Sequence, residues 1–425
     1  MNMQIEYNDK FQQALDLLKN GKNPLFITGN AGTGKSTLLS LFLKNNRKNI
    51  VVLAPTGVAA LNVKGVTIHS FFGFHPGITI ENAKEKGRKS KNISLIRSIE
   101  MIIIDEISMV RADLLDCIDA FLRVALKKQQ PFGGIRMVFI GDLYQLSPVV
   151  QGQEKAFFQI IYESPYFFSA KVMKEVSFEL LELEKIYRQK DLAFIEILNA
   201  IRKNSVTEQQ LEFINQRVIP TEGKEEGFIH LTTTNKAVFQ INEEKLQKLP
   251  GKLYTFKANA DGEFNKDQAP TAEELRIKKQ SQVMLLTNHP DGLWVNGTVG
   301  IVMGIQNDEI MIETQEGETI SVGRHQWDLY KYRFDEKTSS LTQDVIGSFT
   351  QYPLCLAWGI TIHKSQGKTF DKAMIDLSGS FATGQAYVAL SRCRSFEGLI
   401  LKKPVKKGHI HVDSQVVRFL TEWQY

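Results

Sequence analysis

Continuous apolar runs alternate with helix-like patterns through the first part of the chain. Apolar side chains recur at helical spacing over residues 9–19 and again over residues 114–126. Uninterrupted apolar runs, typical of parallel strands that are buried on both faces, occur at residues 24–27, 50–53, 101–104 and 137–140. This alternation predicts a doubly wound α/β domain that binds its ligands at the carboxyl ends of the strands.

The pattern changes in the second half of the chain. Helix and strand signals of a second α/β unit occur at residues 192–202, 207–216 and 227–231. From about residue 253 to 349 short β-type runs are separated by turn signals, which predicts a small antiparallel β-barrel inserted in this unit. We therefore predict a first domain over residues 1–185 and a second over residues 186–425.

The periodic pattern lapses over residues 74–93, which are mostly polar and basic. This stretch is too short for a domain and is interpreted as a small insertion that projects from the first domain. Two interpretations stay open, because the same composition suits an element that contacts nucleic-acid phosphates and a solvated surface loop.

Composition narrows the class of protein only moderately. The chain has 425 residues with a net charge of +5, which permits a nucleic-acid partner without requiring one. Its cysteines, Cys117, Cys355 and Cys393, form no C-x-x-C pair and are interpreted as small hydrophobic residues in a reducing compartment. No apolar run approaches the roughly 20 residues that cross a bilayer. Because the N-terminus also lacks a signal peptide, we expect a cytosolic or nuclear protein that is neither secreted nor in a membrane.

Residues 29–37 carry the strongest chemical signal, since they fit the spacing G-x-x-x-x-G-K-[ST] between a strand and a helix. Backbone N–H groups of such a glycine-rich loop, together with the helix N-terminus, bind phosphate. Lys35 is expected to neutralise the β- and γ-phosphates, and the Ser36 hydroxyl to ligate Mg²⁺. The predicted ATP-binding residues are Gly29, Ala31, Gly32, Thr33, Gly34, Lys35, Ser36 and Thr37.

Catalytic residues are expected where the next strands end. Asp105 and Glu106 follow the strand at 101–104; Asp105 is assigned to Mg²⁺ and Glu106 to activation of the attacking water. Gln145, after the strand at 137–140, is placed to sense the γ-phosphate. Arg188 and Arg392 are candidates to stabilise the transferring phosphoryl group, provided that a second domain faces the first across the nucleotide.

These motifs follow a known order. They run from Gly29–Thr37 through Ala54-Pro55-Thr56-Gly57-Val58-Ala59-Ala60, Asp105-Glu106, Gly141-Asp142 to Gln145, Tyr187-Arg188-Gln189 and Ile362-His363-Lys364-Ser365-Gln366-Gly367 to Ala389-Leu390-Ser391-Arg392. The order resembles motifs I, Ia, II, III, IV, V and VI of superfamily 1 helicases. It is most similar to the Pif-one (petite integration frequency) family of superfamily 1B, relatives of the RecD helicases. Thr67-Ile68-His69-Ser70-Phe71-Phe72 is also typical of that group.

The resemblance implies two RecA-like domains with ATP and Mg²⁺ between them, and makes Arg188 and Arg392 arginine fingers that reach across from the second domain. It implies 5′-to-3′ unwinding of DNA, and action on G-quadruplexes or RNA–DNA hybrids. A glutamine upstream of motif I contacts adenine in this family; Gln12 fits best by spacing, while Gln13 and Gln4 compete with it. Gly367 of motif V is also assigned to the nucleotide site.

A translocating helicase must grip the backbone of a single strand and stack on its bases without reading sequence. Candidate DNA-binding residues are Pro55, Thr56, Gly57, His69, Phe72, Asn296, Thr361, His363, Lys364 and Gln366. Asn288 and Trp294 lie near Asn296 in the sequence and are weaker candidates. For any one of Phe71, Phe72 and Phe74 the hydrophobic core is the competing interpretation, and packing competes equally for Trp294.

The favoured hypothesis is an ATP-dependent DNA helicase that acts on single-stranded, forked or tailed duplex DNA, as a monomer or as a dimer on DNA. A second hypothesis is a DNA-stimulated ATPase that remodels or clamps DNA without unwinding it. A nucleotide-regulated scaffold is a third hypothesis, but it requires an arginine finger from a neighbouring subunit. Because both candidate arginines occur in this chain, the third hypothesis is disfavoured.

Overall fold

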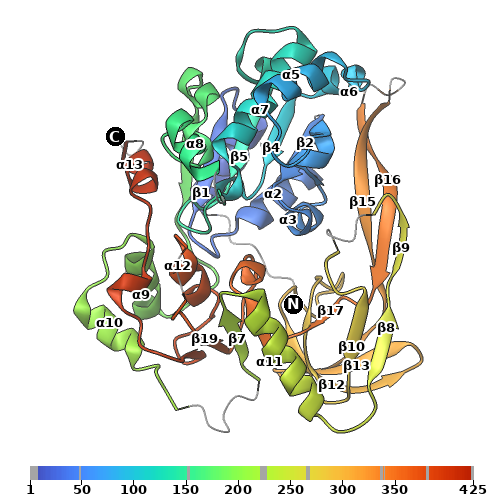
Figure 1. Cartoon of the computed structure of the whole chain (residues 1–425), viewed down its shortest axis with the longest axis vertical. Coiled ribbons are helices and arrows are strands. Elements are labelled where there is room, and N and C mark those ends of the chain that lie inside the picture. The colour runs from blue at the N-terminus through green and yellow to red at the C-terminus, as the bar shows by residue number, and fades with distance from the viewer. Residues whose placement is uncertain are drawn as a thin grey trace.

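The computed structural model describes residues 8–46, 49–150, 154–220, 227–264, 269–335, 338, 340–379 and 382–422. Figure 1 shows two α/β units: β1, β2, β4 and β5 lie in the upper unit, and β7 and β19 lie in the lower one. A long hairpin, β15–β16, runs along one side of both. The first unit is the one built on β1–β6, and the second is the one built on β7 and β18–β20.

The first unit is centred on a six-stranded parallel sheet with the order β3-β2-β4-β5-β1-β6. Its strands are β1 (Leu25–Gly29), β2 (Ile50–Ala54), β3 (Val66–Thr67), β4 (Met101–Ile104), β5 (Arg136–Ile140) and β6 (Glu179–Leu183). Its helices are α1 (Asp9–Asn20), α2 (Lys35–Lys44), α3 (Gly57–Asn62), α4 (Ile68–Phe72), α5 (Ile80–Arg88), α6 (Ile93–Ser98), α7 (Ala112–Leu126) and α8 (Glu154–Ile161). The four strands predicted from apolar runs are confirmed.

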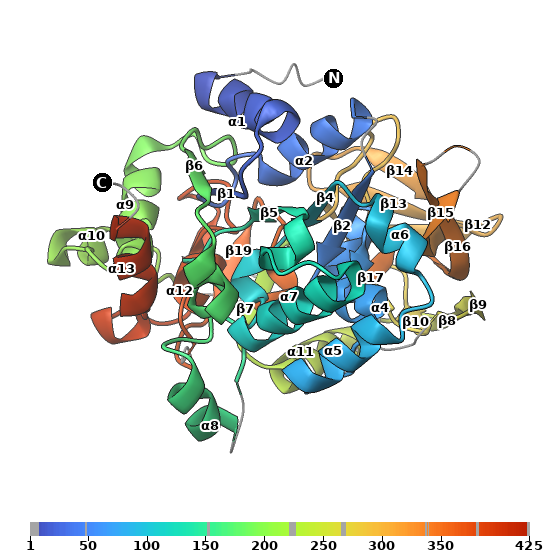
Figure 2. The same cartoon turned by 90° about the horizontal axis from the view of Figure 1, so that it is seen from above.

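Both faces of this sheet are buried, which explains why its strands are continuous apolar runs. Ile27 and Ile103 belong to a core shared with α1 and α2, whereas Phe26 and Ile102 belong to a core shared with α7. Seen from above, α1 and α2 lie on one side of the strands, and α5 and α7 lie on the other (Figure 2). The carboxyl ends of β1, β4 and β5 therefore come together at one edge of a rigid layer.

The second unit has a four-stranded parallel sheet with the order β18-β7-β19-β20. Its strands are β7 (Ile229–Thr232), β18 (Gly359–Thr361), β19 (Ala373–Ile375) and β20 (Leu399–Leu401). Its helices are α9 (Leu192–Arg202), α10 (Glu208–Asn215), α11 (Asn235–Lys248), α12 (Gln385–Leu390) and α13 (Ser414–Glu422). Two parallel sheets in one chain match the predicted α/β class, and the boundary at residue 186 stays a prediction.

Between β7 and β18 the chain forms antiparallel strands with a separate hydrophobic core. They are β8 (Tyr254–Lys257), β9 (Asn259–Gly262), β10 (Glu274–Ile277), β11 (Gln282–Leu285), β12 (Val299–Gln306), β13 (Glu309–Thr314), β14 (Thr319–Val322), β15 (His325–Asp335), β16 (Ser340–Gln351) and β17 (Leu354–Leu356). Their pairings within the described ranges give sheets of five, three and two strands. Closure of these strands into a barrel therefore stays a prediction.

The β15–β16 hairpin also contacts the first unit. The Val52 backbone N–H donates to Tyr332 Oη at 3.0 Å, the Leu341 N–H donates to Asn49 Oδ1 at 2.9 Å, and Gln343 Nε2 donates to the Lys64 carbonyl at 3.0 Å. These bonds connect the β-rich region to the β2–β3 edge of the six-stranded sheet.

About half of the polar stretch 74–93 is helical, because Ile80–Arg88 form α5. α5 packs against α7, where Gly87 lies so close that a Cβ at this position would come within 2.7 Å of the Phe121 carbonyl oxygen. Ala83 is buried in the same contact. The apolar residues that produce this packing are too few and too widely spaced to give a helical pattern in the sequence.

The last helix, α13, returns from the second unit to the first (Figure 1). Phe419 stacks on Phe168 with ring centroids 4.2 Å apart and also contacts Phe26, Phe167 and Phe178. The chain thus joins the two units at both sides, through the hairpin and through this aromatic cluster.

Two of the three cysteines behave as predicted, since Cys117 and Cys393 are buried and Cys355 is partly exposed, all with free thiols. Burial raises the pKa of Cys117 to about 12 and that of Cys393 to about 11. Within the described ranges, no helix combines the length and the apolar composition that crossing a bilayer requires.

Candidate active site between the two units

The glycine-rich loop joins β1 to α2 and is bent by three glycines with positive φ, Gly29 (148°), Gly32 (81°) and Gly34 (88°). At Gly32 a Cβ would come 2.4 Å from Arg188 Cβ, so only glycine allows the later segment to pack on the loop. The Tyr187 N–H also donates to the Gly32 carbonyl at 2.9 Å. The structure therefore brings Arg188 directly onto the phosphate loop.

Lys35 folds back over the loop at the first position of α2. Its Nζ donates to the carbonyl oxygens of Gly29 at 2.7 Å and Asn30 at 3.0 Å. Burial lowers the pKa of Lys35, while the carboxylates of Asp142 and Glu106 act in the opposite direction. An ammonium held only by carbonyls would gain stronger, charge-assisted hydrogen bonds from a phosphate.

The acidic pair lies at the end of β4, as predicted. Burial and the neighbouring Glu106 raise the pKa of Asp105 to about 7, and burial also raises the pKa of Glu106. Glu106 has a left-handed backbone with a φ of 52°, which is unfavourable for a residue with a Cβ. Such strain and desolvation at one point are typical of functional sites.

These residues fit a bound Mg²⁺. Asp105 is 8% exposed, and Ser36 is exposed in the first turn of α2. Both are hard oxygen donors, which Mg²⁺ prefers, and Mg²⁺ commonly takes only one or two protein ligands besides phosphate and water. The described ranges contain no cluster of three or more His, Cys, Asp or Glu side chains that could hold a metal without a phosphate.

Arg392 and Arg188 both lie close to Ser391, just after α12. Arg392 is 1% exposed; its Nε donates to the Val388 carbonyl at 2.8 Å and its Nη2 to Ser391 Oγ at 2.9 Å. Arg188 Nη1 donates to the Ser391 carbonyl at 3.2 Å. Burial and the other guanidinium lower the pKa of Arg188 to about 9, and burial lowers that of Arg392 to about 10. Both cations are thus desolvated next to the predicted site of phosphoryl transfer.

Two glutamines connect the motifs. Gln145 is buried and its Nε2 donates to Asp142 Oδ2 at 3.1 Å. Gln366 donates from Nε2 to Glu106 Oε2 at 3.1 Å across the two units, a contact that we did not predict, and its predicted contact with DNA stays a prediction. The structure therefore places Gln366 at the nucleotide site, because the loop after β18 faces the end of β4.

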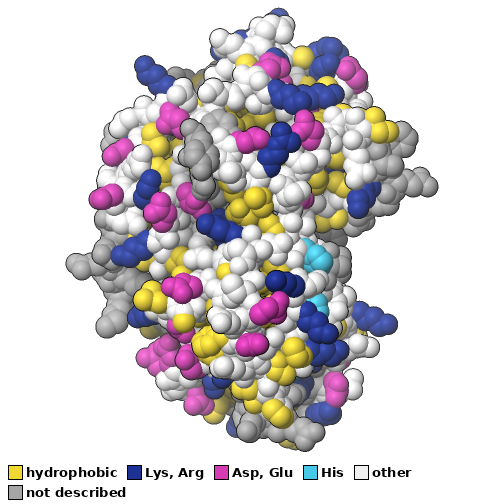
Figure 3. Space-filling model, turned by 90° about the vertical axis from the view of Figure 1, so that its left-hand side faces the viewer, with side chains coloured by type: hydrophobic (Ala, Val, Ile, Leu, Met, Phe, Trp, Pro, Cys, Tyr) yellow, Lys and Arg dark blue, Asp and Glu magenta, His cyan; other side chains and the backbone are white. Residues whose placement is uncertain are grey.

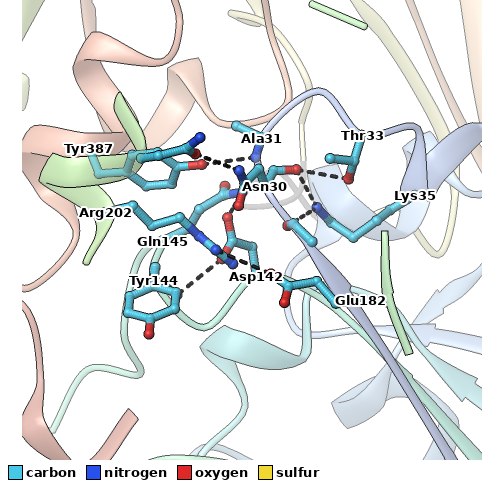
Figure 4. Close-up of polar contacts among 12 residues, drawn as sticks. Asn30, Ala31, Thr33, Lys35, Asp142, Tyr144, Gln145, Glu182, Arg202 and Tyr387 are labelled. Atoms are coloured by element: carbon cyan, nitrogen blue, oxygen red, sulfur yellow. Dashed lines mark hydrogen bonds and ion pairs between the residues drawn. The ribbon is translucent and has the colours of Figure 1, made fainter. Parts of the chain in front are cut away.

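Sequence reasoning missed two residues of this region. Tyr387 on α12 is buried, and its Oη accepts a hydrogen bond from the Ala31 N–H of the phosphate loop at 3.0 Å (Figure 4). Arg202 forms an ion pair with Asp142 at 3.1 Å. A signal for Arg202 existed, since it lies four residues after Leu198 and eight after Phe194, on the apolar stripe of a helix.

The predicted adenine contact is not resolved among its three candidates. Gln12 and Gln13 are both exposed on α1 and line one hollow, and Gln12 Nε2 donates to Asp16 Oδ1 at 3.2 Å. Phe11 of the same helix lies beside Gly34, which brings α1 next to the phosphate loop. Gln4 lies outside the described residues. Gly367 is exposed and has a φ of 77°.

The predicted DNA-binding residues fall into two groups. Thr56, His363 and Lys364 are exposed, and Pro55, Gly57, His69 and Asn296 are partly exposed. The Thr56 hydroxyl caps α3, and Asn296 Oδ1 accepts a 2.6 Å bond from Lys368, a lysine that we did not single out.

Three candidate DNA-binding residues are buried: Phe72, Thr361 and Trp294. Phe72 is 4% exposed and packs against Phe74 and Phe121, so it serves the core rather than base stacking. Thr361 is buried, and its hydroxyl accepts the Lys364 N–H at 3.2 Å, which shapes the loop. Trp294 is buried in the core of the β-rich region.

Comparisons with known proteins identify the family. A family model described as PIF1-like helicase matches residues 3–212. The ATP-dependent DNA helicase Pif1 of Bdellovibrio bacteriovorus is 35% identical over 435 residues, which cover 99% of this chain and 93% of that protein. The chain belongs to the PIF1-like helicase family. Human ATP-dependent DNA helicase PIF1 is 36% identical, and the match covers 88% of this chain but 57% of the human protein.

Solved structures of PIF1-like helicases share the fold and its two RecA-like domains. The structure of Bacteroides sp Pif1 in complex with ADP-AlF4 has a TM-score of 0.91 and 36% identity, covering 98% of this chain and 97% of that one. Bacteroides Pif1 bound to ssDNA has the same identity and covers 99% and 97%, but its TM-score is 0.69. Taken over the whole chain, the present structure is therefore closer to the former structure than to the ssDNA-bound one.

Proposed function

We propose that this PIF1-like helicase uses ATP hydrolysis to move 5′ to 3′ along single-stranded DNA and to unwind the duplex ahead of it. One observation carries this proposal: Gln366 of the second unit donates a hydrogen bond to Glu106 of the first, and the charge of Arg392, also from the second unit, acts on the same carboxylate. Because the site is completed from both units, binding and hydrolysis of a nucleotide between them change their relative position.

Each residue has a role that its position supports. Lys35 and the loop N–H groups bind the β- and γ-phosphates, and Ser36 and Asp105 would hold Mg²⁺, which would neutralise phosphate charge. Glu106 accepts a proton from the attacking water, and its raised pKa suits a base in a desolvated site. Arg188 and Arg392 stabilise charge on the transferring phosphoryl group, and Gln145 orients groups at the γ-phosphate.

The single strand is proposed to lie across the loops that carry Thr56 on the first unit and His363 and Lys364 on the second. A hollow of about 900 Å³ lies between α4–α6 and the β15–β16 hairpin, and basic side chains such as Lys86, Lys91 and Lys331 line it. Such a basic hollow fits the phosphate backbone near a duplex junction. The β-rich region, which we propose to be a small barrel, would guide the strand past it.

Among the described residues, the opposite side of the molecule shows no such surface. Figure 3 shows Lys and Arg side chains interspersed with Asp and Glu side chains over this face, without a large basic patch. Nucleic-acid backbones require clustered positive charge. We therefore place no DNA contact on this face.

Two related structures suggest the partners. One concerns DNA unwinding at forked dsDNA by two coordinating Pif1 helicases, and the other is of Pif1 helicase from Bacteroides in complex with ADP-AlF3 and ssDNA. We propose that this chain binds single-stranded and forked DNA, as a monomer that pairs at a fork. G-quadruplexes and RNA–DNA hybrids are proposed as further substrates.

The test is to measure ATP hydrolysis with and without single-stranded DNA, together with unwinding of duplexes that carry a 5′ or a 3′ tail. Stimulated hydrolysis with unwinding from the 5′ tail alone supports the proposal. Stimulated hydrolysis without unwinding would instead indicate a remodelling ATPase or clamp. Unwinding from the 3′ tail would refute the proposed polarity.

A further inference from the structure

Arg202 is a buried arginine outside the motifs discussed so far. It is the last residue of α9 and is 3% exposed. Its Nη2 lies 3.1 Å from Asp142 Oδ1, its Nη1 lies 3.3 Å from Glu182 Oε1, and its guanidinium carbon lies 4.4 Å from the ring centroid of Tyr144. Figure 4 shows the guanidinium group pointing to all three.

These contacts connect the two units. α9 packs against α12, the helix that leads into Arg392. Asp142 and Tyr144 follow β5, and Glu182 lies in β6, so all three partners belong to the first unit. Arg202 is thus a second-unit side chain inserted among first-unit groups, beside the nucleotide site.

Asp142 is shared between Arg202 and the predicted γ-phosphate sensor. Its Oδ2 accepts from Gln145 Nε2 at 3.1 Å, while its Oδ1 accepts from the Tyr144 N–H at 3.2 Å. The neighbouring backbone is tightly enclosed, because a Cβ at Gly384 would lie 2.1 Å from the Gln145 carbonyl oxygen. The negative charge of Asp142 also acts on Lys35.

We propose that Arg202 is a positioning residue for ATP hydrolysis, which fixes the Asp142 carboxylate and through it orients the Gln145 carboxamide. Because Arg202 comes from the second unit, the orientation of Gln145 depends on how the two units sit together. The inference rests on the proposed ATP hydrolysis.

The substitutions must separate positioning from stability, since removing one partner of a buried ion pair leaves an uncompensated charge. Arg202→Lys keeps the charge but loses the planar fork that holds two carboxylates. Arg123→Lys is the matched control, because Arg123 forms an ion pair with Asp119 at 2.8 Å within α7, away from the nucleotide site. Gln145→Ala, alone and combined with Arg202→Lys, completes a double-mutant cycle.

The measurements are the melting temperature, the Kd for single-stranded DNA, and kcat and KM for ATP with and without DNA. We expect Arg202→Lys to lower kcat by about 10- to 100-fold, as misplaced catalytic groups do, with less than about a threefold change in the Kd for DNA. In the Gln145→Ala background the same substitution should cost much less in kcat, because the group it positions is gone. Arg123→Lys should lower the melting temperature alone.

The inference is overturned if Arg202→Lys lowers the melting temperature but keeps the wild-type kcat, because Arg202 would then have only a structural role. This is the result expected for the control Arg123→Lys. Additive losses in the cycle would also overturn it, because they would separate Arg202 from Gln145. Failure of the proposed function looks different, since the wild-type protein would then show no DNA stimulation. In that case the basal kcat still decides the role of Arg202.

Discussion

The hydroxyl of Tyr387 accepts a hydrogen bond from a backbone N–H group that a bound phosphate would also use. The Ala31 N–H of the glycine-rich loop donates to Tyr387 Oη at 3.0 Å. If the loop binds phosphate through its N–H groups, ATP must compete with this hydroxyl. We therefore expect Tyr387→Phe to bind ATP more tightly than the wild-type protein does.

The magnitude follows from the cost of an unpaired buried group. Leaving a buried N–H without a partner costs about 1–3 kcal/mol. The substitution imposes this cost on the nucleotide-free protein, whereas in the nucleotide-bound protein a phosphate oxygen has replaced the hydroxyl. A difference of about 1–2 kcal/mol between the two states tightens binding by roughly 5- to 30-fold.

Isothermal titration with a non-hydrolysable ATP analogue measures the effect, and Tyr332→Phe is the matched control. Tyr332 Oη also accepts a hydrogen bond from a buried backbone N–H, that of Val52 at 3.0 Å, but this bond joins the β15–β16 hairpin to the first unit. Both variants should lose about 1–2 kcal/mol of stability without nucleotide, and only Tyr387→Phe should gain affinity. Weaker binding by Tyr387→Phe would refute the reasoning, because the hydroxyl would then assist the nucleotide. An equal change in both variants would show that the effect is not local.

Three further predictions concern charged residues. Arg392→Ala should lower kcat by about 10³-fold or more, as arginine fingers do, with nearly unchanged affinity for the ATP analogue; an unchanged rate would contradict its role. The pKa of Asp105 is raised to about 7, so the carboxylate destabilises the metal-free fold increasingly as pH rises from about 4 and fully above about 7. Asp105→Asn should therefore raise the free energy of unfolding by a few kcal/mol at pH 8 but little at pH 4, measured by urea denaturation in EDTA, whereas a gain independent of pH would contradict this. Lys364→Ala should weaken single-strand binding and reduce the slope of log K against log salt by about 0.7, and an identical slope would mean that Lys364 does not contact phosphate.

Much of the fold could be predicted because local patterns determine it. The strands of the first sheet are buried on both faces, and this burial produces the continuous apolar runs. The helix α5 could not be predicted, because its packing depends on close approach at Gly87 and on Ala83, which carry little apolar signal. Closure of the β-rich region depends on strand pairings distant in sequence, which no short window contains.

The residues of the candidate site likewise fall into those that the sequence predicted and those that it did not. Lys35 and Asp105-Glu106 were predictable because the chemistry requires them at fixed offsets from a strand. Gln366 was assigned to DNA because its loop is polar. Its contact with Glu106 depends on how the two domains face each other, which the sequence does not show. Tyr387 and Arg202 act by burial against another part of the chain, so their residue types alone gave no indication of their contacts.

The aromatic cluster around Phe419 has a consequence for biosynthesis. Phe168 and Phe178 are translated about 240 residues before the helix that covers them. A ribosome produces the first domain first, and this domain can fold while the second is still being made. During that interval its aromatic surface lacks its final cover, which makes the nascent chain a candidate for chaperone binding until α13 is complete.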